Sequence, residues 1–118
     1  MNHWPKVKES NLAEKLRLFL GLRRNFRVNG PSMLPTLRDG EQVLADLGAY
    51  KNEHPRVGEI VVAFHPDKPI KLIKRVAEVL KDGRYVLKGD NLAESNDSRD
   101  FGAISRDQIL GRVTSKLI

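Results

Sequence analysis

The chain has 118 residues, which is enough for one domain with a small core. It carries 21 Lys and Arg against 15 Asp and Glu, a formal net charge of +6, and it contains no cysteine. The lack of cysteine excludes disulfides, thiol catalysis and Cys-based zinc sites. The basic residues are spread through the chain without an aromatic stacking motif, so we do not expect the protein to bind nucleic acid.

The first apolar pattern predicts an amphipathic helix over residues 11–24. Four apolar side chains recur at helical spacing after a capping Ser10 or Asn11: Leu12, Leu16, Phe19 and Leu20. The run is too short and too charged to cross a bilayer, which needs ~20 apolar residues, and it has no signal-peptide cleavage pattern. The leading interpretation is a helix packed on the domain. The alternatives are contact with a membrane surface through residues 12–22, and self-association.

A stiff turn follows at residues 29–37, Asn-Gly-Pro-Ser-Met-Leu-Pro-Thr-Leu. Ser32 stands between two prolines, and each proline fixes its own φ and turns the preceding residue away from helix. A rigid turn that carries one hydroxyl is a plausible seat for a nucleophile. Serine needs a base to act as one.

Histidine is a poor candidate for that base. His3 lies near the start of the chain, and His54 and His65 lie in polar stretches flanked by proline. No local pattern supplies the carboxylate that would orient an imidazole in a Ser-His-Asp triad. The base is therefore sought among lysines that burial could keep neutral.

The strand predicted over residues 69–79 offers such a lysine. With a period of two, one face carries mainly apolar residues: Ile70, Leu72, Lys74 and Val76. The opposite face is mixed and more solvated, and it carries Lys71, Ile73, Arg75 and Ala77. Desolvation would lower the pKa of Lys74 and let it take a proton from Ser32. The alternative is that Lys74 extends to water from a half-buried strand.

A long polar loop over residues 89–102 is the third candidate segment. Loops of this length in a small domain are often functional. Ser95 could hydrogen-bond a neutral lysine, and Asp97 and Arg99 could pair to make the loop rigid. The alternative is an ordinary solvated loop.

Turn signals separate five apolar runs and predict a mainly β chain. Strands are expected over residues 41–46, 57–64, 69–79, 84–88 and 109–118, and Asp82-Gly83 predicts a hairpin. The expected architecture is a single antiparallel β domain over residues 26–118, preceded by a helical segment over residues 1–25.

These segments together resemble the type I signal peptidases, a family of serine-lysine proteases. The resemblance rests on residues 30–37, 73–76, 89–91 and 95–102, with support from residues 56–62 and 109–113, in the family's order. It implies a β domain of the signal-peptidase and LexA-like type. It also implies that Ser32 attacks the scissile carbonyl, that Lys74 is the general base, and that the Ser32 N–H is part of the oxyanion hole.

The resemblance assigns further roles near the dyad. Some family members carry a serine side chain as an oxyanion donor two positions before the nucleophile, where this chain has Gly30. Ser95 matches the serine that orients the lysine. Asp97 and Arg99 match the residues that hold the loop. No metal or other cofactor is implied.

The expected substrate is the leader of a precursor protein, bound as an extended peptide. Typical family members have a transmembrane anchor, and this sequence shows none. It therefore resembles the branch that matures nickel-type superoxide dismutase, which implies leader removal from that precursor in the cytoplasm. Three alternatives stay open: general signal-peptidase processing of membrane or exported proteins, a self-cleaving LexA- or UmuD-like domain, and a non-catalytic module that binds extended peptides.

Overall fold

The computed structural model describes residues 4–93 and 101–117, and within them it is mainly β. One helix, α1 (Leu12–Phe19), precedes the strands, and a short 3-10 turn, η1 (Arg106–Gln108), leads into the last of them. The strands are β1 (Arg24–Arg27), β2 (Gln42–Asp46), β3 (Ile60–Phe64), β4 (Lys71–Val79), β5 (Tyr85–Lys88) and β6 (Ile109–Leu117). The predicted fold class, an antiparallel β domain with an N-terminal helix, is confirmed.

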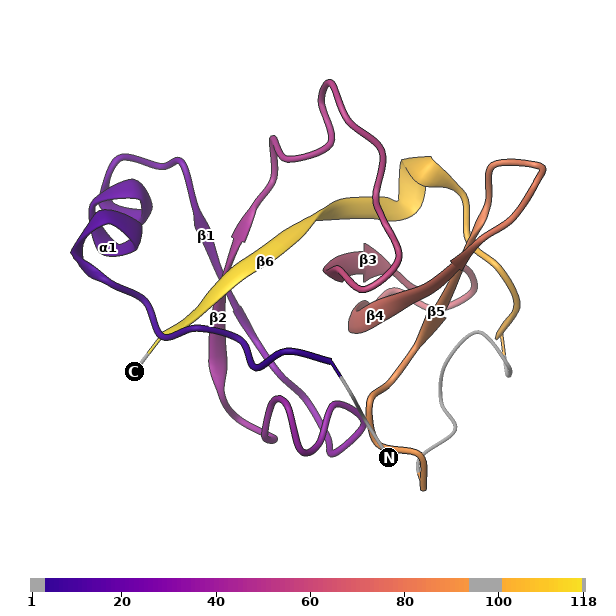
Figure 1. Cartoon of the computed structure of the whole chain (residues 1–118), viewed down its shortest axis with the longest axis horizontal. Helices are drawn as coiled ribbons and strands as arrows, with labels where there is room; N and C mark the ends of the chain where they lie inside the picture. Colours follow the sequence, from indigo (N-terminus) through magenta and orange to yellow (C-terminus); the bar gives the residue numbers. More distant parts are fainter. Residues whose placement is uncertain (1–3, 94–100, 118) are drawn as a thin grey trace.

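The strands form one antiparallel sheet in the order β1-β2-β6-β3-β4-β5. The last strand in sequence, β6, pairs with β2 along one edge and with β3 along the other, so it joins the two halves of the molecule (Figure 1). Register shifts interrupt the β2–β6, β3–β6 and β4–β5 ladders. Such bulges bend and twist strands, which lets a small sheet curl around its core.

Two apolar clusters fill the interior. One lies among β3, β4, β5 and the segments beside them, and consists of Tyr50, Val61, Ala63, Val76, Tyr85, Leu87, Ile104 and Ile109. The other lies beneath the chain that connects β1 to β2, and consists of Val28, Met33, Leu37, Val43 and Ile60. The second cluster therefore supports the turn that carries Ser32.

Glycines account for two strand boundaries. Gly83 has a φ of +86° in the turn between β4 and β5, which confirms the predicted hairpin. Gly58 has a φ of +97°, a conformation that L side chains rarely adopt, and its N–H bonds to the carbonyl of Val76. The predicted strand over residues 57–64 therefore begins only at Ile60.

The helix is shorter than the predicted segment of residues 11–24. It begins after Asn11, whose side chain caps the helix by accepting the Glu14 N–H at 2.9 Å, and it ends at Phe19. Gly21 then reverses the chain with a φ of +78°, and β1 starts at Arg24. The local apolar pattern did not predict β1. This strand forms by pairing with β2, which lies farther along the chain.

The helix α1 packs on the domain, in agreement with the leading interpretation, but it does so through Glu14 and not through its apolar residues. Leu12 and Phe19 are 74% and 86% exposed, whereas Glu14 is only 1% exposed. The carboxylate of Glu14 accepts hydrogen bonds from the hydroxyls of Thr114 and Ser115 on β6. The helix therefore docks through its acidic residue, and its leucines face away from the sheet.

Candidate active site

The turn that carries Ser32 is fixed from below. Met33 and Leu37 are fully buried in the second apolar cluster. Gly30 has a φ of +87°, and its N–H donates to Oδ1 of Asp39 at 2.7 Å. Ser32 is left half-buried at the surface of a rigid turn, as the two flanking prolines predicted.

The chain that follows β5 clamps this turn from the side. The backbone N–H of Asn91 donates to the Ser32 carbonyl at 2.9 Å, and the Asn91 side-chain amide donates to the Pro31 carbonyl at 2.9 Å. Gly89 passes so close that a Cβ there would lie 2.4 Å from the Ser32 carbonyl oxygen. Only glycine fits this crossing, so the backbone of the 89–91 segment sets the position of Ser32.

Strand β4 supplies Lys74. The residue is 4% exposed and lies on the same face as the buried Leu72 and Val76, opposite Val61 of β3. The predicted apolar face is buried from Leu72 to Val76, whereas Ile70 is 45% exposed, and the alternative of a lysine that extends to water is not supported. Burial disfavours a charged ammonium relative to a neutral amine, which is the protonation state that a general base needs.

One cavity brings the two candidate residues together. It has a volume of about 300 Å³, and its walls come from the turn before and at Ser32 and from the first half of β4. Its lining consists of Arg27, Val28, Asn29, Gly30, Pro31, Ser32, Ile70, Lys71, Leu72, Ile73 and Lys74. Two segments about forty residues apart in sequence thus meet at a space that a peptide can enter.

Two strand edges that pair with no other described strand border this cavity. β1 lies at the end of the sheet and pairs only with β2. On β4, the β5 ladder begins at Arg75, so the strand up to Lys74 pairs only with β3. The Val76 N–H donates to the Glu59 carbonyl, and the Ile70 carbonyl accepts the His65 N–H, so the even-numbered residues direct their backbone groups toward β3. Alternation therefore directs the amides of Lys71 and Ile73 toward the open edge.

A buried ion pair connects the segments that form the site. Arg75 Nη2 lies 2.6 Å from Asp90 Oδ2, and Arg75 Nε lies 3.2 Å from Asp90 Oδ1. The Thr36 hydroxyl also donates to Asp90 at 2.5 Å, and Arg75 donates to the Gly58 carbonyl at 2.8 Å. The guanidinium further lies 5.0 Å from the centre of the Trp4 ring. This network joins the serine turn, the lysine strand and the chain after β5.

The sequence interpretation missed the roles of Arg75 and Asp90. Strand alternation placed Arg75 on the more solvated face, and that expectation is wrong, because the residue is 4% exposed. At Arg75, β4 is buried on both of its faces. The N-terminal segment with Trp4 covers the face that carries Arg75. The only available signal was an arginine next to the candidate base and an aspartate next to a glycine.

Three predicted site residues cannot be placed. Ser95, Asp97 and Arg99 lie outside the described residues, so their roles stay predictions. Gly30 lies in the lining of the cavity, and its proposed place beside the oxyanion stays a prediction. Within residues 4–93 and 101–117, no group of three or more His, Asp or Glu side chains is arranged to hold a metal ion. In the same residues, no helix has the length and apolar character to span a bilayer.

Comparison with known proteins agrees with this architecture. The family described as "Signal peptidase, peptidase S26" matches residues 12–80 and 77–118. Signal peptidase IB of Staphylococcus aureus (strain COL) is 27% identical, over 75% of this chain and 74% of its own length. Mitochondrial inner membrane protease subunit 1 of Xenopus tropicalis is 35% identical, over 72% of this chain and 63% of its own length.

The chain belongs to the peptidase S26 signal peptidase family. Membership implies a serine endopeptidase that processes precursor proteins.

Proposed function

We propose that this protein is a serine endopeptidase that removes an N-terminal leader with Ser32 as nucleophile and Lys74 as general base. The observation that carries the proposal is that both residues line one cavity, and that Lys74 is buried on the apolar face of β4. A hydroxyl alone is a weak nucleophile, and a neutral amine beside it is the activating group that this chain offers.

The mechanism follows from these two groups. Lys74 Nζ accepts the hydroxyl proton as Ser32 Oγ attacks the scissile carbonyl, and it returns that proton to the leaving amine. An acyl-enzyme remains, and a water activated by the same amine hydrolyses it. Each step requires the amine to be neutral when it accepts a proton.

The backbone N–H of Ser32 is positioned to stabilise the developing oxyanion. It donates to none of the residues that the structure describes, and it belongs to a turn held by Met33, Leu37 and Asn91. A donor that is fixed before the reaction costs no reorganisation. Gly30 offers no side chain, so a second donor must be a backbone group or water.

The substrate would bind as an extended strand. The open edges of β1 and of the first half of β4 border the cavity, and the amides of Lys71 and Ile73 are directed toward the open side. A peptide laid between such edges gains main-chain hydrogen bonds without any particular side chain. This mode suits the flexible leader of a precursor protein better than a folded segment.

The loop that follows Asn91 would complete the site. Ser95 is proposed to hydrogen-bond the neutral amine of Lys74 and orient it, and Asp97 and Arg99 are proposed to hold the loop. Support for this comes from the family resemblance and from the fixed starting point of the loop at Asn91.

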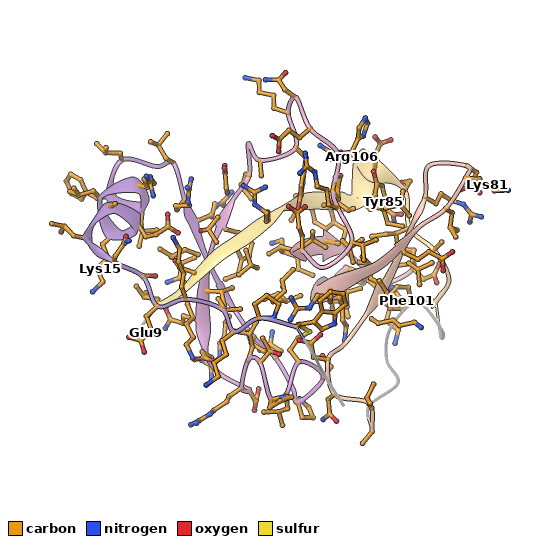
Figure 2. The ribbon with its side chains drawn as sticks, viewed as in Figure 1. Glu9, Lys15, Lys81, Tyr85, Phe101 and Arg106 are labelled. Carbon is orange, nitrogen blue, oxygen red and sulfur yellow. The ribbon has the colours of Figure 1, made fainter. Side chains whose placement is uncertain are left out.

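The exposed face of α1 favours contact with a lipid surface. Leu12, Leu16, Phe19 and Leu20 are each at least half exposed. The only carboxylate of the helix is buried against β6, so its outer surface carries cations alone, Lys15 and Arg17. Lys15 projects away from the strands (Figure 2). Apolar residues flanked by cations suit the interface of an anionic bilayer.

The particular precursor remains open. A nickel-type superoxide dismutase precursor, processed in the cytoplasm, stays a prediction from the sequence resemblance. The membrane-associated relative from mitochondria favours an alternative, general processing of membrane or exported proteins. Incubation with each class of precursor, followed by N-terminal sequencing of the product, separates them.

The decisive experiment compares cleavage by the wild type, Ser32→Ala and Lys74→Ala, with Lys81→Ala as the matched control. Lys81 lies at the tip of the β4–β5 loop, on the far side of the molecule from α1 (Figure 2). We expect both site variants to lose cleavage while they remain folded, and the control to retain it. The wild-type rate should also fall toward acidic pH, because an ammonium cannot accept a proton.

Other outcomes would change the proposal. Near-wild-type turnover by either site variant would refute the dyad. Shortening of the protein itself, with intact precursor, would support a self-cleaving domain. Tight binding of an uncut precursor would support a non-catalytic peptide-binding module.

A further inference from the structure

Two neighbouring cavities beside Ser32 share the same two cations. The first, of about 300 Å³, contains Arg27 and Lys71 in its lining along with Lys74. The second, of about 540 Å³, also contains Arg27 and Lys71, and its other walls are mostly apolar, with Phe26, Val62, Phe64, Pro69, Ile70 and Ile73 beside Asn29. No described aspartate or glutamate lines either cavity.

The cations come from opposite sides of the groove. Arg27 ends β1 and Lys71 begins the part of β4 whose edge is open. Both side chains are exposed, and neither forms an ion pair with a described carboxylate. The nearby carboxylate of Asp39 accepts the Gly30 N–H and is not in the lining.

The Lys71 ammonium has a partial restraint. It lies 6.0 Å from the centre of the Phe26 ring, which forms part of the second cavity. A cation at this distance from a ring centre is attracted to the aromatic face. Lys71 is thereby kept over the groove.

We propose that the preferred leaders carry an aspartate or glutamate within about five residues of the cleaved bond, bound between Arg27 and Lys71. This proposal rests on the proposed peptidase function and adds a substrate preference to it. Arg27 precedes Ser32 by five positions, so the two residues lie no farther apart than five extended residues span, at about 3.3 Å per residue, and this sets the upper limit of the range.

The groove favours such a contact over a surface ion pair. Apolar walls exclude water from one side of the cations, and a carboxylate between an arginine and a lysine gains charge-assisted hydrogen bonds. The preference should also weaken with salt, because both cations remain partly exposed. For one exposed acidic residue we expect about a fivefold gain in kcat/KM at low ionic strength.

The test uses alanine-rich peptides in which a single Glu or its neutral match Gln is moved along the residues around the cleaved bond. The Glu-to-Gln ratio of kcat/KM is measured for the wild type, Arg27→Gln, Lys71→Gln, the double variant, and the control Lys81→Gln. The proposal expects a ratio of about five at one or more positions for the wild type and the control, and a ratio near one for the double variant.

A wild-type ratio near one at every position, or a ratio that survives in the double variant, would overturn the proposal. If no peptide is cut, the same Glu and Gln peptides are compared by equilibrium binding to the Ser32→Ala protein, which reports the charge preference without turnover. Loss of cleavage with an intact binding preference would then count against the peptidase assignment alone.

Discussion

Arg75 and Asp90 form a two-pronged ion pair that is buried at the meeting point of the serine turn, the lysine strand and the chain after β5. Their side chains are 5% and 1% exposed, and the shorter of the two contacts is 2.6 Å. Arg75 also donates to the Gly58 carbonyl, and Asp90 also accepts from the Thr36 hydroxyl. Both charged groups therefore have further hydrogen-bond partners. The pair fixes the relative position of the segments on which the proposed chemistry depends.

Removal of one partner should therefore be costly. Asp90→Ala leaves the buried guanidinium without its carboxylate, and we expect the free energy of unfolding to fall by about 3 kcal/mol. Urea denaturation measures this loss. The double variant Arg75→Met/Asp90→Leu should lose less than the sum of the single variants, because no unpaired charge remains. Strictly additive losses would contradict the coupling.

The crossing at Gly89 should control activity through the backbone. Gly89→Ala places a Cβ against the Ser32 carbonyl and must displace the serine turn. We expect kcat/KM on a leader peptide to fall at least about tenfold, since small misplacements of reacting groups are costly. Gly48→Ala is the matched control, because its Cβ would meet its nearest neighbour, Asp46 Oδ1, at an ordinary 3.5 Å. If the two substitutions lower kcat/KM equally, displacement of the serine turn by a Cβ at residue 89 is not the cause of the loss.

Glu14 should give the fold a pH-dependent contribution. Burial opposes ionisation of this carboxyl, but hydrogen bonds from Thr114, Ser115 and Arg17, with the nearby charge of Arg23, outweigh it and lower its pKa from 4.5 to about 2. Because the folded-state pKa is the lower one, the stabilisation is complete above pH 4.5 and is lost as the pH falls toward 2. The two values correspond to about 3 kcal/mol.

This prediction is checked by chemical denaturation between pH 7 and pH 3. Glu14→Gln should be less stable than the wild type at pH 7, and the difference should shrink at pH 3. A difference that stays constant over this range would show that the charge of Glu14 does not contribute.

The exposed face of α1 should determine binding to lipid. Leu16→Glu and Phe19→Glu place charge on residues that are 51% and 86% exposed, so we expect weaker sedimentation with anionic vesicles and an unchanged free energy of unfolding. Val79→Glu is the control, since that residue is 44% exposed at the β4–β5 end. If vesicle binding persists in both helix variants, α1 is not the lipid contact. If the wild type forms a dimer and the two helix variants do not, the exposed face of α1 binds a second copy of the protein.

Local patterns sufficed for much of the fold. The apolar runs, the Asp82-Gly83 turn and the prolines around Ser32 predicted the strands other than β1, the hairpin and a rigid serine turn. Each of these depends on neighbours in sequence, through backbone dihedral limits and side-chain alternation. Alternation also placed Lys74 on the same face as Leu72, but it left open whether the side chain is buried or extends to water.

Contacts between distant segments could not be predicted in this way. The position of β6 between β2 and β3 and the crossing of Gly89 over Ser32 depend on pairing across the whole chain. Arg75 was assigned to the wrong environment because the N-terminal segment covers its face. The orientation of the helix could not be predicted, because periodicity shows which face of a helix is apolar, whereas the bonding groups on β6 decided which face docks.

The sequence by itself determined the residue types, the turn and the strand that the proposed chemistry needs, because these follow from local conformational limits. The tertiary structure alone decided that Ser32 and Lys74 share one cavity, that Arg75 and Asp90 connect its walls, and that the leucines of α1 face away from the protein. Those results depend on which partners satisfy buried polar groups, and such partners are fixed only when the whole chain has folded.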